Sequence, residues 1–110
     1  MIYRVVFTQR ASDELAGAAK WWMRHRSHEQ AAKWYSGFSD AIASLVDSPE
    51  RCPLAAENGV VPYEIREMHY GLGARATHRA VFVIRPDMVL ILTIRHASQP
   101  ELTDADFPGT

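Results

Sequence analysis

Hydrophobic residues recur along the first half of the chain at the spacing of an α-helix. A β-branched and aromatic run at 2–7 predicts a strand, and Thr8 follows it as a residue that can cap a helix. The apolar positions after this cap are four, three and four residues apart, so they share one helix face. These positions are Ala11, Leu15, Ala18 and Trp22. The pattern predicts an amphipathic helix that ends near the basic run 24–26.

A second helix is predicted directly after the first. Ser27 and Gln30 have the spacing of a capping box, and a stripe of apolar residues at helical spacing follows them. The stripe consists of Ala31, Trp34, Tyr35, Phe38, Ala41, Ile42 and Leu45. Pro49 is expected to end this helix, because the residue before a proline is pushed out of the helical region. A turn of only about three residues joins the two helices, so we expect an antiparallel hairpin.

The second half of the chain has the pattern of a loop followed by a sheet. Residues 50–62 contain prolines and a glycine with little periodicity, which predicts a loop. Three runs rich in strand-forming residues follow, and the last is so continuously apolar that we expect it at the centre of the sheet. The runs span 63–69, 78–85 and 89–96. A glycine-containing turn at 71–77 and the pair Pro86-Asp87 connect them.

The predicted fold is therefore α+β with the element order β-α-α-β-β-β. An N-terminal strand and an antiparallel two-helix hairpin precede a three-stranded antiparallel meander, and the helices pack on one face of the sheet. The other face is expected to be concave and partly open, with any functional site there or in the adjacent loops. We expect one domain at 1–99 and a loosely held, polar and acidic tail at 100–110.

Composition narrows the class of protein. The chain has 110 residues, of which 47% are hydrophobic and 23% charged, as in an ordinary globular domain. Its apolar runs fall far short of the roughly 20 residues that a membrane-spanning helix needs. The opening residues lack the features of a signal peptide, and the single Cys52 excludes an internal disulfide. We therefore expect a cytoplasmic protein with no cofactor, no metal site, no membrane contact and no small-molecule ligand.

The net charge of −1 conceals an uneven distribution of charge. Residues 63–96 carry five arginines against three acids, together with three of the five histidines, whereas the charged residues after them are all acidic. A mildly positive segment of this kind can meet phosphate or an acidic partner. It is weak beside the strongly basic surface of a typical nucleic-acid binder.

Candidate chemistry lies along the strands. Glu64 and Arg66 are two residues apart and share a sheet face, Arg79 begins the next strand, and His96 ends the last. In a meander these positions can converge. Two arginines can hold a phosphate, and a histidine can transfer a proton near neutral pH, which together suits metal-free RNA cleavage. The alternatives are that the arginines are solvated or paired with acids, and that His96 is a surface histidine.

The tryptophans divide into two groups. Trp22 and Trp34 fit the apolar stripes of the two helices and are predicted to pack in the core. Trp21 lies off its stripe, so it is a candidate for an aromatic side chain that faces a partner.

Several stretches also match a known family pattern. They are the opening 3–8 with Ala11 and Leu15, the run from Trp34 to Pro49, and the segments Glu64-Ile65-Arg66, His78-Arg79-Ala80-Val81-Phe82 and Ile91–His96. Over about residues 2–99 the chain resembles the RelE/ParE toxins of type II toxin–antitoxin (plasmid stabilisation) systems. The resemblance implies a growth-inhibiting toxin that a cognate antitoxin binds and neutralises.

The resemblance also implies one of two targets. ParE-type members poison DNA gyrase and have no established hydrolytic centre, whereas RelE-type members cut mRNA on the ribosome without metal. In the second case Arg79 matches the arginine before the apolar pair of the middle strand. Arg66 matches one of two paired basic residues, with Glu64 in place of the other. Other ribonuclease members use a glutamate, an arginine and a late histidine, and Glu64, Arg66 and His96 would supply those catalytic residue types. The basic C-terminal stretch and terminal tyrosine of RelE are absent.

Three hypotheses follow. The low net charge favours the ParE-like gyrase poison, since binding to a polyanion strengthens with each phosphate that the protein neutralises. The first alternative is a ribosome-dependent mRNA endonuclease, with Arg66 and Arg79 on the phosphate and His96 as acid or base. The second is a non-toxic family member that only binds its antitoxin. Only the endonuclease would make the protein an enzyme.

Overall fold

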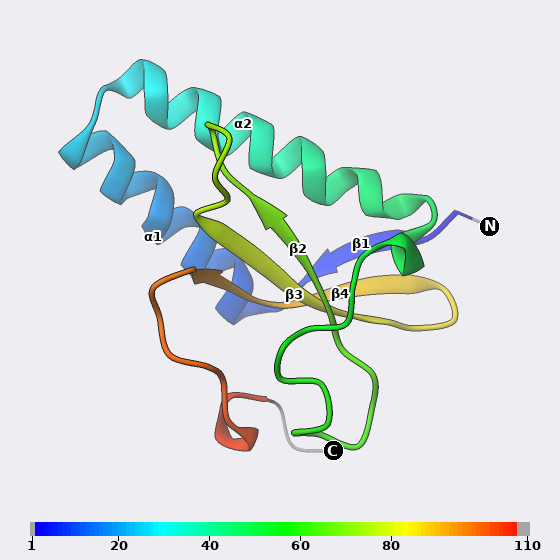
Figure 1. The fold of residues 1–110 in the computed structure, drawn as a ribbon. Coiled ribbons are helices and arrows are strands. Elements are labelled where there is room, and N and C mark those ends of the chain that lie inside the picture. The colour runs from blue at the N-terminus through cyan, green and yellow to red at the C-terminus, as the bar shows by residue number, and fades with distance from the viewer. Residues whose placement is uncertain (1, 108–110) are drawn as a thin grey trace.

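The structure, a computed structural model, describes residues 2–107 (Figure 1). Its helices and strands are β1 (Arg4–Phe7), α1 (Gln9–His25), α2 (His28–Ala43), β2 (Arg66–Tyr70), β3 (His78–Ile84) and β4 (Met88–His96). Short 3-10 turns lie at Ser44–Val46, Pro49–Arg51 and Asp104–Asp106. The predicted α+β class and the order β-α-α-β-β-β are therefore confirmed.

Both predicted helix caps are present. Thr8 Oγ1 accepts a hydrogen bond from the Ala11 amide at 3.1 Å, and Ser27 Oγ accepts one from the Gln30 amide at 3.0 Å. Each cap satisfies an amide that the first helical turn leaves without a backbone partner. Because the second cap follows so closely on the end of α1, the chain reverses there and the helices lie side by side as a hairpin (Figure 1).

Helix α2 ends earlier than predicted. The α-helix stops at Ala43, and a 3-10 turn continues to Val46. The Ser44 hydroxyl donates to the carbonyl oxygen of Ala41 at 2.6 Å, and this side-chain bond competes with the helical backbone pattern. Pro49 only begins the next 3-10 turn, after Ser48 has adopted a left-handed φ of 49°. The prediction that Pro49 ends the helix is therefore wrong.

The sheet has the strand order β1-β4-β3-β2. β2, β3 and β4 form the predicted antiparallel meander, whereas β1 pairs with β4 in parallel. β4 therefore has a strand on each side, as its nearly continuous apolar sequence predicts. Thr8 Oγ1 also donates to the carbonyl oxygen of Leu92 at 2.9 Å, which fixes the start of α1 on β4.

The helices cover one face of the sheet, and the main core lies between these two layers. Trp34, Phe38 and Ile42 of α2 are buried in one cluster with Phe82 and Ile91 of the strands. Burying an aromatic or large aliphatic side chain stabilises a fold by about 1.5–3 kcal/mol relative to leaving it exposed. This layer carries the larger share of the apolar packing.

A glycine in α2 makes the close packing of helix and sheet possible. A Cβ at Gly37 would lie 1.8 Å from the hydroxyl oxygen of Tyr70, so another residue there would push the Tyr70 side chain aside. With glycine in place, the ring of Tyr70 stacks on that of Phe38 at a centroid distance of 5.1 Å.

The other face of the sheet is also covered, so the prediction of an open, concave face is wrong. Ala55 and Ile65, from the loop after α2, and Leu102 and Phe107, from the C-terminal segment, form a second apolar cluster with the strands. Figure 1 shows this loop and segment on the side of the sheet away from α2. The functional surface must therefore be sought elsewhere.

The C-terminal segment is anchored by polar contacts as well. Arg10 Nη1 donates to the carbonyl oxygen of Asp106 at 2.8 Å, and its Nη2 lies 3.2 Å from the Asp106 carboxylate. Leu102 and Phe107 are only 3% and 7% exposed. The prediction of a loosely held tail is wrong as far as Phe107, and residues 108–110 lie outside the described residues. Two apolar residues isolated in a polar sequence gave no periodic signal. The domain boundary at 99 stays a prediction.

Among residues 2–107, neither α1 nor α2 is long and apolar enough to cross a lipid bilayer.

Candidate functional site

Arg79 lies in a buried cluster of charges. Its Nη1 donates to Glu57 Oε1 at 2.7 Å and to Glu67 Oε1 at 2.9 Å, and its Nη2 donates to the other oxygen of Glu57. The side chain of Arg79 is 13% exposed and that of Glu57 is fully buried. The hydrogen bond from Arg79 lowers the pKa of Glu57 to about 2. The guanidinium is thus occupied by two carboxylates rather than free to hold a phosphate.

Arg66 fastens the loop after α2 to the sheet. Its Nη1 donates to the carbonyl oxygens of Cys52, at 2.6 Å, and Glu50, at 3.2 Å. Its Nη2 lies 3.0 Å from Glu64 Oε1, so the structural alternative of an Arg66–Glu64 pair is present. The carboxylate of Glu64 is largely exposed, and such a pair contributes little on its own.

His96 stands at the end of β4 beside a second histidine. Its ring meets that of His78 edge to face, with centroids 5.0 Å apart. The Ser98 amide donates to His96 Nδ1 at 3.0 Å, so this nitrogen accepts and, in the neutral ring, Nε2 carries the proton. Burial, reinforced by the charge of His96, lowers the pKa of His78 to about 4. His78 is therefore neutral at pH 7.

The structure does not bring Arg66, Arg79 and His96 together. His78 and Arg79 are adjacent on β3, so they project to opposite faces of the sheet. His78 lies beside His96 on the helix-covered face, whereas Arg79 lies on the face covered by the loop and the C-terminal segment. Arg66 is opposite Phe82, at the other end of β3 from His78. The predicted convergence is therefore wrong, because strand alternation and register separate the three side chains.

Sequence reasoning missed Glu57 and His78. Glu57 lies in a stretch predicted as loop, and nothing in its spacing indicates that it pairs with Arg79. His78 carried a usable signal, because it precedes Pro86 by eight residues and His96 follows Asp87 by nine. In a tight antiparallel hairpin, residues about equally far from the turn lie opposite each other. The observed register places His78 opposite His96.

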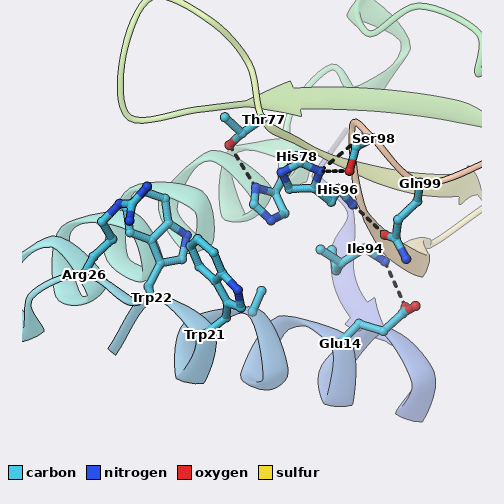
Figure 2. A pocket seen from close by; sticks show the side chains of 11 residues that line it. Glu14, Trp21, Trp22, Arg26, Thr77, His78, Ile94, His96, Ser98 and Gln99 are labelled. Atoms are coloured by element: carbon cyan, nitrogen blue, oxygen red, sulfur yellow. Dashed lines mark hydrogen bonds between the residues drawn. The ribbon is translucent and has the colours of Figure 1, made fainter. Parts of the chain in front are cut away.

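A groove of about 610 Å³ opens between α1 on one side and the start of β3 and the end of β4 on the other (Figure 2). Trp21, Trp22 and Arg26 line it from the helix, and His78 and His96 line it from the strands. Trp21 is 47% exposed, as its position off the helix stripe predicts, whereas Trp34 is fully buried. Aromatic and cationic groups thus share one hollow, which suits a partner that has both apolar and acidic character.

Residues 2–107 contain no group of three or more histidine, cysteine, aspartate or glutamate side chains placed to hold a metal ion. The two histidines of the groove have serine and threonine hydroxyls as their hydrogen-bonding neighbours.

The fold recurs in a solved structure titled "Chromosomal ParDE TA system from P. aeruginosa". The match has a TM-score of 0.68 and 17% sequence identity, and it covers 86% of this chain and 96% of the other. The helical hairpin on a four-stranded sheet is therefore a fold that this toxin–antitoxin structure shares. No curated protein matches the sequence.

The sequence itself is more specific than the fold. Residues 5–100 match the family model described as the ParE toxin of the type II toxin–antitoxin system parDE, and the chain belongs to this family. The resemblance to RelE/ParE toxins is confirmed, and with it the role of toxin component with a cognate antitoxin as partner. The family match ends before the buried Leu102 and Phe107, so the C-terminal segment that closes the second sheet face lies outside it.

Proposed function

We propose that this toxin acts in the cytoplasm by binding DNA gyrase and poisoning it, without bond-breaking chemistry of its own. The observation that carries the proposal is the separation of Arg66, Arg79 and His96, of which Arg79 is fully engaged with Glu57 and Glu67. Three side chains that lie apart cannot together hold and protonate one phosphate. The family and the net charge of −1 support the same conclusion.

The test uses purified toxin with DNA gyrase, ATP and supercoiled plasmid. A poison traps the enzyme on cut DNA, so treatment with detergent and protease should release linear plasmid in proportion to the toxin added. Heat-unfolded toxin is the control. In parallel, translating ribosomes with a defined mRNA should give no new cleavage products.

A second candidate, the ribosome-dependent endonuclease, is favoured by one observation. His96 lines the groove, and of its ring nitrogens only Nδ1 is engaged by Ser98. His96→Ala separates the two candidates, because it would abolish mRNA cleavage but should leave gyrase poisoning intact. Cleaved mRNA with unaffected gyrase would reject the proposal. Absence of any growth arrest on expression without the antitoxin would leave only antitoxin binding.

A further inference from the structure

Most of the sheet is closed to partners. The helices cover one face, and the loop after α2 with the C-terminal segment covers the other. The outer edge of β2 is also occupied, since the Glu67 amide donates to the carbonyl oxygen of Pro53 at 3.0 Å and Leu54 bridges to Arg66. The groove between α1 and the ends of β3 and β4 is the larger of two prominent hollows in the described residues, at about 610 Å³ against 410 Å³.

The charged side chains of this groove differ in whether they have bonding partners within the described residues. The carboxylate of Glu14 accepts hydrogen bonds from the Thr93 hydroxyl at 2.7 Å, the Ile94 amide at 3.0 Å and Arg10 at 3.3 Å. The guanidinium of Arg26 has no carboxylate partner among residues 2–107. The one acid in the groove is therefore neutralised by its own surroundings, and a cation is left for a ligand.

The other cations on this half of α1 lie outside the groove lining. Lys20 and Arg24 form no ion pair within the described residues, but neither lines the groove. At the far wall His96 is exposed, and its Nε2–H can donate a hydrogen bond to a carboxylate. The groove thus favours a ligand that carries a carboxylate.

The apolar part of the groove is aromatic. Trp21 and Trp22 meet edge to face at 5.9 Å, and Arg26 lies 5.6 Å from the centroid of the Trp21 ring. Tryptophan and arginine are the residue types that most often dominate binding energy where proteins meet. A half-exposed tryptophan beside an unpaired arginine is the combination expected at the centre of a protein interface.

We propose that this groove binds a short acidic segment of a partner protein that carries one large apolar side chain. The apolar side chain packs on Trp21 and Trp22, and a flanking carboxylate pairs with Arg26 and His96. A protein segment fits better than a nucleic acid, because the single arginine in the groove lining neutralises few phosphates and the groove is built around packed aromatic rings. The inference does not depend on gyrase as the target.

The probe is a capped pentapeptide with a central phenylalanine and two glutamates on each side, titrated into the 110-residue toxin by calorimetry. The matched peptide has glutamines in place of the glutamates, and a third has alanine in place of the phenylalanine. The acidic phenylalanine peptide should bind about threefold to fivefold more tightly than the glutamine peptide, since one exposed ion pair contributes up to about that factor. It should also bind more tightly than the alanine peptide, which lacks the ring that packs on the tryptophans. Its binding should also change the fluorescence of Trp21.

Variants locate the site. Arg26→Gln and His96→Gln should each weaken binding of the acidic peptide by about threefold to fivefold. Trp21→Ala should weaken it more strongly, by about tenfold or more. The matched controls are Arg24→Gln and His28→Gln, which change the same residue types outside the groove lining and should stay within about twofold of the parent. Circular dichroism confirms that each variant is folded.

Several outcomes would overturn the inference. Equal binding of the acidic and glutamine peptides, no binding of either, or equal weakening by the control variants would each do so. Tighter binding of a single-stranded oligonucleotide, with displacement of the peptide, would assign the groove to nucleic acid instead. The gyrase assay and the peptide assay test separate proposals. A toxin that fails to poison gyrase can still bind the peptide, and a toxin that poisons gyrase can fail to bind it.

Discussion

His78 and Arg79 are neighbours on β3, yet the regions they belong to differ in what they leave free. Arg79 is surrounded by Glu57 and Glu67, and each partner of the cluster is used within the fold. On the other side of the strand, His78 borders a groove in which Arg26 has no acidic partner among the described residues. A charged residue on a strand therefore indicates function only where its hydrogen-bonding groups are not already bonded to other residues of the fold.

The largest loss of stability is expected when Arg79 is replaced. Arg79→Met leaves two carboxylates buried without their cation, and breaking a buried ion pair in this way costs about 3–5 kcal/mol. Urea unfolding followed by circular dichroism measures the loss. Arg75→Met, in the exposed turn between β2 and β3, is the control and should cost less than about 0.5 kcal/mol. A fully stable Arg79→Met protein that had lost only toxicity would assign Arg79 to the target.

The second-largest loss of stability tests how firmly the C-terminal segment covers the sheet face on which Arg79 lies. Phe107→Ala removes a 7% exposed ring from the second apolar cluster, and such a truncation should lower the free energy of unfolding by about 3 kcal/mol. Asp104→Asn, at an exposed position in the same segment, should be nearly neutral. Equal stabilities of the two variants would mean that the segment detaches in solution and that the second sheet face is available after all.

A pH titration separates the two sides of β3. The pKa of His78 is lowered to about 4 by burial and by His96, so its contribution to stability is complete above about pH 6.5 and is lost as the pH falls toward 4. The pKa of Glu57 is lowered to about 2 by Arg79, so its contribution is lost only as the pH falls from about 4.5 toward 2. Melting temperatures between pH 8 and pH 3 should show both windows.

The variant His78→Asn identifies the first window. It should remove the loss of stability between pH 6.5 and pH 4 while keeping the loss at lower pH. His28→Asn, at an exposed position beside the turn between the helices, should retain the parent profile. If His78→Asn also kept the parent profile, protonation of His78 would not be what destabilises the fold.

The smallest effect is expected at His96. It is exposed, and its ring lies against His78 and accepts or donates a hydrogen bond with Ser98, so His96→Ala should change the free energy of unfolding by less than about 0.5 kcal/mol. The free energy of unfolding lost by Arg79→Met in the same urea experiment is the value with which this small change is compared. A loss near that of Arg79→Met would show that the groove side is as fully committed to the fold as the buried cluster.

The fold was largely predictable from the sequence because its elements carry local signals. Thr8 and Ser27 cap their helices as expected, and the apolar stripe of α2 becomes the core with Trp34 and Phe38 fully buried. The parallel pairing of β1 with β4 was not predicted, because it joins residues more than 80 positions apart and leaves no periodic trace.

The candidate site was less predictable. Strand spacing placed Arg66 and Glu64 correctly as a pair, but Arg79 finds a partner in Glu57, 22 residues away in an irregular loop. Contacts of that kind depend on how a loop folds back, which neither periodicity nor composition encodes. The exposure of Trp21, by contrast, was predictable because its departure from the helix stripe is a local property.

The parallel pairing of β1 also sets an order of events during synthesis. The first strand lies against β4, and the start of α1 is tied to it by bonds from Thr8 to Leu92 and from the Ile94 amide to Glu14. None of these contacts can form until nearly the whole chain has left the ribosome, and such distant contacts form slowly. The groove has walls on α1, β3 and β4, so it too exists only in the finished chain. A translation product that stops before β4 therefore cannot present this surface.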